Sequence, residues 1–336
     1  MDIFMLFSFL GGLALFLYGM KTLGSGLERL SGDRMRSLLA RLCSTPLRGV
    51  LVGAAVTAAI QSSSATTVMV VGFVNSGLMQ LSHAVGIIMG ANLGTTATSW
   101  ILSLTGIEGN NFFVRLLKPS SLAPLLTFAG VIPIMFSKRE GARRVGGILA
   151  GLGILFFGMQ TMSDAVEPLS EQPWFGQLLT LFSNPVAGLL AGLALTALIQ
   201  SSSASIGILQ ALSASGGVTF STAIPIVMGQ NIGTCVTTLI SSVGASKNAK
   251  RAAFIHLYFN VIGTAVLLVS FYGLNSVVDF AFYSSAVTPF WIAMIHTIFN
   301  VASTIILFPF SSFLRRLAEI TVSNRERRRK KRASGT

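Results

Sequence analysis

Two polar blocks that recur at one fixed distance constrain the fold more than any other feature of this chain. The run TAAIQSSSA around Gln61 returns as TALIQSSSA around Gln200, with eight of nine positions identical. The run GANLGT around Asn92 returns as GQNIGT around Asn231, and both pairs are 139 positions apart. One ungapped offset therefore relates about residues 11–105 to a second copy, which predicts an internal duplication.

The composition places both copies in a membrane. Hydrophobic residues make up 52% of the 336 residues and charged residues only 10%, whereas soluble domains carry about 25% charged residues. Apolar stretches such as Phe4–Tyr18 and Phe290–Phe310 approach the ~20 residues that a helix needs to cross the hydrocarbon layer. The first stretch lacks a basic leader and a small-residue cleavage site, so we expect a membrane span there and not a signal peptide. We expect an all-α, multi-pass protein of the cell membrane.

The distribution of charge predicts that the two copies have opposite orientations. Positions 21–48 carry six Lys or Arg residues, whereas the equivalent positions 160–187 carry none. The next pair has the opposite bias, since 243–251 carries three and 104–112 carries none. Under the positive-inside rule, equivalent loops of the two copies face opposite sides of the membrane. Two inverted-topology repeats are a recurrent plan of secondary transporters.

The chain then divides into four regions. We expect a first transmembrane repeat at 1–136, a second, inverted repeat at 137–272, a final transmembrane helix at 273–313 and a basic cytoplasmic tail at 314–336. The expected crossings are 3–20, 80–104, 119–136, 145–162, 219–242, 252–272 and 289–310, and the expected re-entrant hairpins are 47–76 and 185–215.

The basic tail also bears on the partners of the protein. The net charge is +13, and a dense basic run occupies Arg325–Arg332. No aromatic residue is interleaved with these charges, which favours contact with anionic lipid over nucleic-acid binding. We therefore expect the lipid bilayer as a partner, no nucleic acid, and a cytoplasmic C-terminus.

Both kinds of repeated block predict interrupted helices. The arms beside Gln61–Ser64 are too short to cross the membrane, and four consecutive polar residues cannot face lipid, so a helical hairpin is expected. Glycines lie two positions before and after Asn92 and Asn231, which predicts a broken transmembrane helix in each repeat. Small-residue pairs such as Gly49 and Gly53 predict close helix packing, within the chain or in a homodimer.

These positions also predict an anion site. Each serine block precedes a helix, and a helix N-terminus offers free N–H groups and about half a positive charge. The asparagines are expected to cap the restarted helices. Since neither block contains an acidic or basic residue, neutral donors would hold a small oxyanion, and a coupling cation would balance its charge. The predicted substrate ligands are Gln61, Ser62, Ser63, Ser64, Asn92, Thr95, Gln200, Ser201, Ser202, Ser203, Asn231 and Thr234. Sodium is expected near Ser63, Thr66, Asn92, Ser202 and Asn231.

Other interpretations remain open at this point. A single serine commonly bonds to its own helix backbone, but two matching blocks favour a site. Another small oxyanion, such as sulfate or a dicarboxylate, suits the same donors, and so does an anion channel. No P-loop, metal-ligand cluster or nucleophile with an adjacent base occurs, so we expect neither an enzyme nor a resident cofactor.

A second pattern occurs near the end of the chain. His256 and Asn260 recur as His296 and Asn300, each pair lying on one helix face. We expect them to form hydrogen bonds between helices. Ion coupling is the alternative role.

The paired Gln-Ser-Ser-Ser blocks, each followed by Gly-x-Asn-x-Gly-Thr, resemble the signature of the type II sodium-dependent phosphate cotransporter family. The resemblance covers about residues 10–310. It implies inorganic phosphate as substrate, sodium as coupling ion, re-entrant hairpins that carry the phosphate site, and alternating access. The chain is also similar to the bacterial branch, many members of which continue into a domain like the phosphate-regulatory protein PhoU. It ends at Thr336, and we expect it to lack that domain.

Overall fold

The computed structural model describes residues 3–42, 45–106, 118–170, 172, 177 and 179–322. These residues are almost entirely helical and form no β-strand, with one isolated bridge between Thr219 and Ala286. The helices are α1 (Ile3–Leu42), α2 (Pro46–Ile60), α3 (Ser63–Asn75), α4 (Leu81–Ser103), η1 (Leu104–Gly106), α6 (Pro119–Phe136), α7 (Glu140–Ser170), α9 (Pro185–Ile199), α10 (Ser202–Ala214), α11 (Phe220–Ser241), α12 (Lys247–Val278), α13 (Pro289–Leu307) and α14 (Ser311–Thr321).

Six segments in the described part of the chain are long and apolar enough to cross a membrane. They are Ile3–Arg29, Leu81–Gly106, Glu140–Pro168, Phe220–Ser241, Lys247–Val278 and Pro289–Leu307. The predicted all-α membrane fold is therefore confirmed. The segment predicted to cross at 119–136 is α6, which falls among the shorter apolar helices and packs beside α7.

Both predicted hairpins are present, and they have the same dimensions. α2 and α9 have 15 residues each, and α3 and α10 have 13 each. Two residues join the arms of each hairpin. At a rise of about 1.5 Å per residue, none of these arms crosses ~30 Å of hydrocarbon alone.

The predicted breaks around Asn92 and Asn231 are wrong, because α4 and α11 are continuous helices through both positions. The flanking glycines serve close packing instead. A Cβ atom on Gly90 would clash with the carbonyl oxygen of Val50 in α2, and one on Gly229 would clash with that of Leu189 in α9. The glycines thus allow the first arm of each hairpin to lie directly against the long helix that follows it.

The ends of the chain also differ from the prediction. The sequence predicts a first crossing at 3–20, whereas the candidate span is Ile3–Arg29 and its helix α1 continues to Leu42. No proline interrupts this helix before Pro46. At the other end, part of the predicted tail forms the amphipathic helix α14, whose Leu314 and Ala318 are buried. The Arg251 guanidinium donates to the carbonyl of Val322 at the end of α14. The rest of the predicted tail, 323–336, lies outside the described residues.

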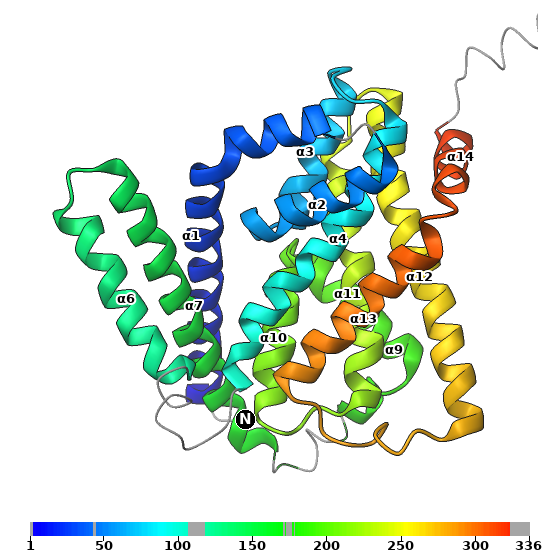
Figure 1. Cartoon of the computed structure of the whole chain (residues 1–336). Helices are drawn as coiled ribbons and strands as arrows, with labels where there is room; N and C mark the ends of the chain where they lie inside the picture. The colour runs from blue at the N-terminus through cyan, green and yellow to red at the C-terminus, as the bar shows by residue number, and fades with distance from the viewer. Residues whose placement is uncertain are drawn as a thin grey trace, which may run out of the picture.

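The long helices of the two copies run in opposite directions (Figure 1). Gly106, just after α4, lies against Pro289 at the start of α13. Phe220, which opens α11, packs against Trp291 in the same turn of α13, with ring centroids 5.8 Å apart. The end of α4 and the start of α11 therefore lie at one end of the bundle. This arrangement supports the inverted repeats; their orientation in the membrane and their boundaries stay predictions.

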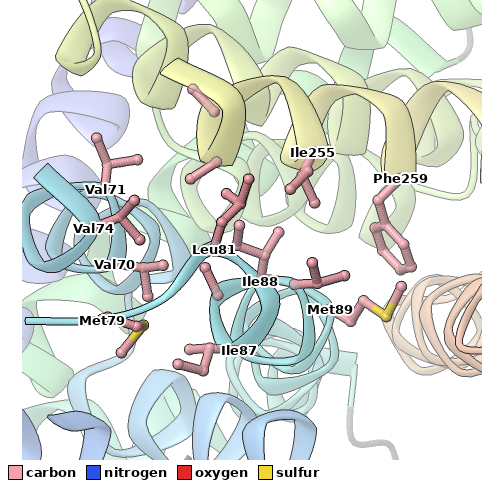
Figure 2. Packing of buried hydrophobic residues seen from close by; sticks show 14 of the residues in the cluster. Val70, Val71, Val74, Met79, Leu81, Ile87, Ile88, Met89, Ile255 and Phe259 are labelled. Carbon is pink, nitrogen blue, oxygen red and sulfur yellow. The ribbon is translucent and has the colours of Figure 1, made fainter. Parts of the chain in front are cut away.

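The last two long helices also fit a pseudo-symmetric plan. α12 packs against α3, α4 and α11, whereas α13 packs against α10, α11 and α4. Exchanging each helix for its repeat equivalent converts the first set into the second. The largest hydrophobic cluster of the described residues lies where α3, α4 and α12 meet, and Figure 2 shows Ile88 and Met89 of α4 facing Ile255 and Phe259 of α12. This core holds α3 and α4 against α12.

Replacing Gly90 by alanine tests the packing role of the glycines. We expect Gly90→Ala to destabilise the protein by about 1–3 kcal/mol, because the new methyl group must push α2 away from α4. Gly72→Ala in α3 is the matched control, since a Cβ atom there meets no atom within 4 Å. Thermal unfolding in detergent would measure both variants, and an unchanged midpoint for Gly90→Ala would contradict the interpretation.

Candidate functional site

The tips of the two hairpins have the same backbone conformation. Gln61 ends α2 in the left-handed region with φ 57°, and Gln200 ends α9 with φ 58°. This conformation is uncommon for residues other than glycine, so its occurrence at equivalent positions is specific. The next residue caps the following helix in each copy: the Ser62 hydroxyl accepts from the Ala65 N–H at 3.1 Å, and the Ser201 hydroxyl accepts from the Ala204 N–H at 3.2 Å.

Each serine block therefore forms a helix N-terminus, as the sequence predicts. The first N–H groups of a helix have no partner within the helix and remain available to other acceptors. Ser63 and Ser202 occupy the first helical position of α3 and α10, and both are buried. Ser203 is also buried, whereas Ser62, Ser64 and Ser201 are half-buried. The two glutamines differ, since Gln61 is buried and Gln200 is exposed.

Two threonines connect the first hairpin tip to the second copy. The Thr67 hydroxyl in α3 lies 2.9 Å from the carbonyl oxygen of Ser63, one helical turn earlier. It also lies 3.0 Å from the hydroxyl of Thr238 in α11, and both threonines are buried. The first turn of α3 is thereby fixed to the C-terminal half of α11.

The connection continues through a buried histidine to Asn92. Thr238 Oγ1 lies 3.0 Å from His256 Nδ1, and His256 Nε2 lies 3.2 Å from Asn92 Oδ1. Because Asn92 Oδ1 can only accept, Nε2 donates to it. Asn92 Nδ2 in turn donates to Asn260 Oδ1 at 2.9 Å. The structure thus joins the Ser63 backbone and Asn92 in one buried hydrogen-bond network across α3, α4, α11 and α12.

The predicted capping role of the asparagines is wrong, since neither begins a helix. The side-chain amide of Asn92 bonds to Asn260 in α12. Asn231 Nδ2 donates to the carbonyl oxygen of Val227 in its own helix at 2.9 Å. The hydroxyls of Thr95 and Thr234 likewise donate to carbonyls four residues earlier, at 3.1 Å and 2.9 Å. The ligand roles assigned to these four residues stay predictions.

The repeated His-Asn pattern behaves differently in its two copies. His256 and Asn260 form the predicted bonds between helices, through Asn92. The Asn300 amide donates to the His296 carbonyl within α13 at 2.8 Å. The prediction of hydrogen bonds between helices is therefore wrong for His296 and Asn300. His296 Nδ1 and Asn300 Oδ1 are buried without a hydrogen-bond partner in the described structure.

The second hairpin is less fully bonded than the first. Thr57 donates to Thr66 Oγ1 at 2.9 Å in the first copy. The equivalent residues Thr196 and Ser205 are also buried, but neither hydroxyl has a partner in the described structure. Gln230 Nε2 donates to the Ser205 carbonyl at 3.0 Å, while Gln230 Oε1 remains unpaired. Unpaired buried polar atoms are uncommon and costly, which marks this region as one able to receive a polar ligand.

Several of these contributors are absent from the sequence-based set of ligands. Thr67 lacks a repeated partner that would single it out, because position 206 is isoleucine. Thr238 corresponds to Ser99, but both lie outside the two polar blocks. Gln210 offered a usable signal, since it is a glutamine within an apolar helix. Its Nε2 donates to the carbonyls of Ser99 and Pro289, both at 3.1 Å, and joins α10 to α4 and α13.

The chemistry of both hairpin tips is that of neutral hydrogen-bond donors and oxygen acceptors. The serine blocks contain no acidic or basic residue. In the described part of the chain, no group of three or more His, Cys, Asp or Glu side chains is placed to hold a metal ion. Serine hydroxyls and helix N–H groups suit an oxyanion, and threonine and carbonyl oxygens suit a hard cation such as Na⁺.

Comparison with known proteins agrees with this chemistry. The model of a family described as Na⁺/Pi-cotransporter matches the chain twice, over residues 15–164 and 157–283. The "Uncharacterized protein YqeW" of Bacillus subtilis (strain 168) is 29% identical over 318 residues, which cover 94% of this chain and 98% of that protein. No solved structure matches the chain.

Two further relatives have names that state a transported substrate. The "Putative inorganic phosphate export protein YjbB" of Salmonella typhimurium is 27% identical over 92% of this chain and 54% of that protein. The "Sodium-dependent phosphate transport protein 2A" of Rattus norvegicus is 45% identical over 188 residues, 54% of this chain and 29% of that protein. The chain thus spans about half of the first of these relatives and less of the second.

Substituting Thr238 tests the buried network. We expect Thr238→Val to destabilise the protein by about 1–3 kcal/mol, because Thr67 and His256 would each lose a partner in a buried site. Thr237→Val is the matched control: Thr237 is adjacent in α11, and its one hydrogen bond, to the Gln200 carbonyl, is long at 3.5 Å. Thermal unfolding midpoints in detergent would compare them. Equal midpoints would show that the network does not stabilise the fold.

Proposed function

The chain belongs to the Na⁺/Pi-cotransporter family, and from that premise we propose that it carries inorganic phosphate across the cell membrane together with sodium, by alternating access. The observation that carries this proposal is the matching backbone conformation of the two hairpin tips. Each places a left-handed glutamine and a serine cap at the N-terminus of a short helix. In this proposal a tetrahedral oxyanion accepts hydrogen bonds from both tips, and the family, described as Na⁺/Pi-cotransporter, supplies the identity of that oxyanion.

The proposed phosphate ligands are the residues of the two serine blocks. The Ser63 and Ser202 hydroxyls and the free N–H groups of the first turns of α3 and α10 would donate to the phosphate oxygens. Gln61 and Gln200, with the caps Ser62 and Ser201, would fix the tips around the anion. The remaining proposed contributors are Ser64, Ser203, Asn92, Asn231, Thr95 and Thr234.

In this proposal, sodium compensates the charge of the anion and couples its transport to that of the cation. An anion held by neutral donors in a low-dielectric site keeps an uncompensated charge, which is costly. One or more Na⁺ ions near Ser63, Thr66, Asn92, Ser202 and Asn231 would offset that charge, so that neither ion enters a closed site favourably without the other. Coupling then follows from charge balance, without a proton-carrying carboxylate. Sodium is a transported ion here, not a resident cofactor.

The antiparallel α4 and α11 support the alternating-access part of the proposal. In inverted-repeat transporters, the two halves can exchange conformations about a site at their interface. A multi-pass protein of this kind would keep its basic C-terminus in the cytoplasm, where anionic lipid holds it. Assembly as a homodimer belongs to the same proposal.

Uptake into proteoliposomes tests the transport reaction. We expect labelled phosphate to accumulate with saturable kinetics when Na⁺ is the external cation, and to fall to the level of empty liposomes when K⁺ replaces it. An excess of sulfate should leave the rate nearly unchanged. Non-saturable flux in K⁺ would instead indicate an anion channel, and strong competition by sulfate or a dicarboxylate would identify a carrier of another anion.

Alanine substitutions test the serine blocks. We expect Ser63→Ala and Ser202→Ala each to weaken the apparent affinity for phosphate or Na⁺ at least about tenfold, since a hydrogen bond to a charged group contributes about 1.5–3 kcal/mol. Ser76→Ala and Ser215→Ala are matched controls, because they occupy equivalent positions at the far ends of α3 and α10. Unchanged affinities for both ions in both test variants would remove these serines from the site.

A further inference from the structure

A polar cavity is lined by residues far along the chain from the hairpin tips. It has a volume of about 740 Å³. It lies between α1, the C-terminal end of α6 and the N-terminal end of α7. In Figure 1, these three helices stand together on one side of the molecule. Four cationic side chains and a single carboxylate line it: Lys21, Arg29, Arg143, Arg144 and Glu140.

Among the described residues, most of this positive charge has no counter-charge. Arg144 pairs with Glu140 at 2.8 Å, one turn away on α7. No carboxylate among the described residues lies within ion-pair distance of Lys21, Arg29 or Arg143. Cations gathered around one cavity repel one another unless an anion lies between them, and arginines bind phosphate groups through paired N–H donors.

The remaining lining adds hydroxyl groups and a boundary with apolar surface. Tyr18, Thr22 and Ser25 contribute hydroxyls on the α1 side. Next to the lining residue Ile134, Met135 and Phe136 are 69% and 77% exposed at the end of α6. A polar cavity bordered by exposed apolar side chains suits an amphiphile, whose charged head enters the cavity while its chains lie along the helices.

From this juxtaposition, we propose that the cavity binds the phosphate-bearing headgroup of an anionic phospholipid. Basic cavities between transmembrane helices at the cytoplasmic surface are suited to such headgroups, and the predicted orientation puts the turn between α6 and α7 on that side. Inorganic phosphate shares the same chemistry and is the competing source of the anion. The apolar border favours the lipid. The proposal does not depend on the transport cycle, since its site shares no residue with the hairpin tips.

Lipid binding to the purified full chain in detergent tests the proposal. The probes are cardiolipin, phosphatidylglycerol, phosphatidylcholine and inorganic phosphate, each titrated while the unfolding midpoint and the bound mass by native mass spectrometry are recorded. The test variant is Lys21→Gln/Arg143→Gln. Lys247→Gln/Lys250→Gln at the start of α12 is the control, because it removes the same charge from the same predicted side of the membrane. An Arg29→Gln single variant provides a second, milder change.

We expect cardiolipin to raise the unfolding midpoint of the wild type and of the control, and phosphatidylcholine to leave it unchanged. The apparent affinity for cardiolipin should fall about 30-fold in the double variant, since each cation near a membrane surface contributes about a fivefold factor. A midpoint shift by phosphate alone, lost in the same variant, would support the anion site and assign it to free phosphate. Equal cardiolipin affinity in the test and control variants would overturn the proposal, whether or not phosphate transport is observed.

Discussion

The structure depends on one constraint: a polar group within a membrane must find its partner inside the protein. Both serine blocks meet this constraint in the same way. The left-handed glutamine ends one short helix, and the serine after it caps the next helix, so the chain reverses within two residues. The reversal exposes helix N–H groups at a defined point. A structural requirement and a binding capability therefore arise from the same residues.

Close helix packing is what makes such a hairpin rigid. Gly90 and Gly229 let α2 and α9 lie against α4 and α11 at a distance that no other residue permits. In the other arm of the first hairpin, Thr67 and Thr238 tie α3 to α11. The first hairpin is thus held through α2 by backbone contact and through α3 by hydrogen bonds. Support of both arms is needed if small hydroxyl groups at the tip are to act as ligands without charged residues nearby.

The sequence predicted the features that depend on local pattern, and it failed where tertiary packing decides. The hairpins and helix N-termini followed from polarity and arm length around Gln61 and Gln200. The glycines around Asn92 predict breaks from the sequence alone, because a helix-breaking glycine and a packing glycine have the same sequence signature. Only the position of Val50 against Gly90 separates them. The role of Thr238 was equally inaccessible, since its partners Thr67 and His256 are 171 and 18 positions away.

The two copies share their polar blocks but make different bonds around them, and this difference bears on mechanism. Thr57 and Thr66 are bonded to each other in the first hairpin, whereas Thr196 and Ser205 in the second are not. His256 reaches Asn92 across helices, whereas His296 Nδ1 is buried without a partner in the described structure. In the proposed alternating-access cycle, the bonded arrangement of one half would be the one that the other half adopts in the opposite state. Such a cycle needs this inequality, because identical bonding in both halves would make the inward-facing and outward-facing arrangements the same.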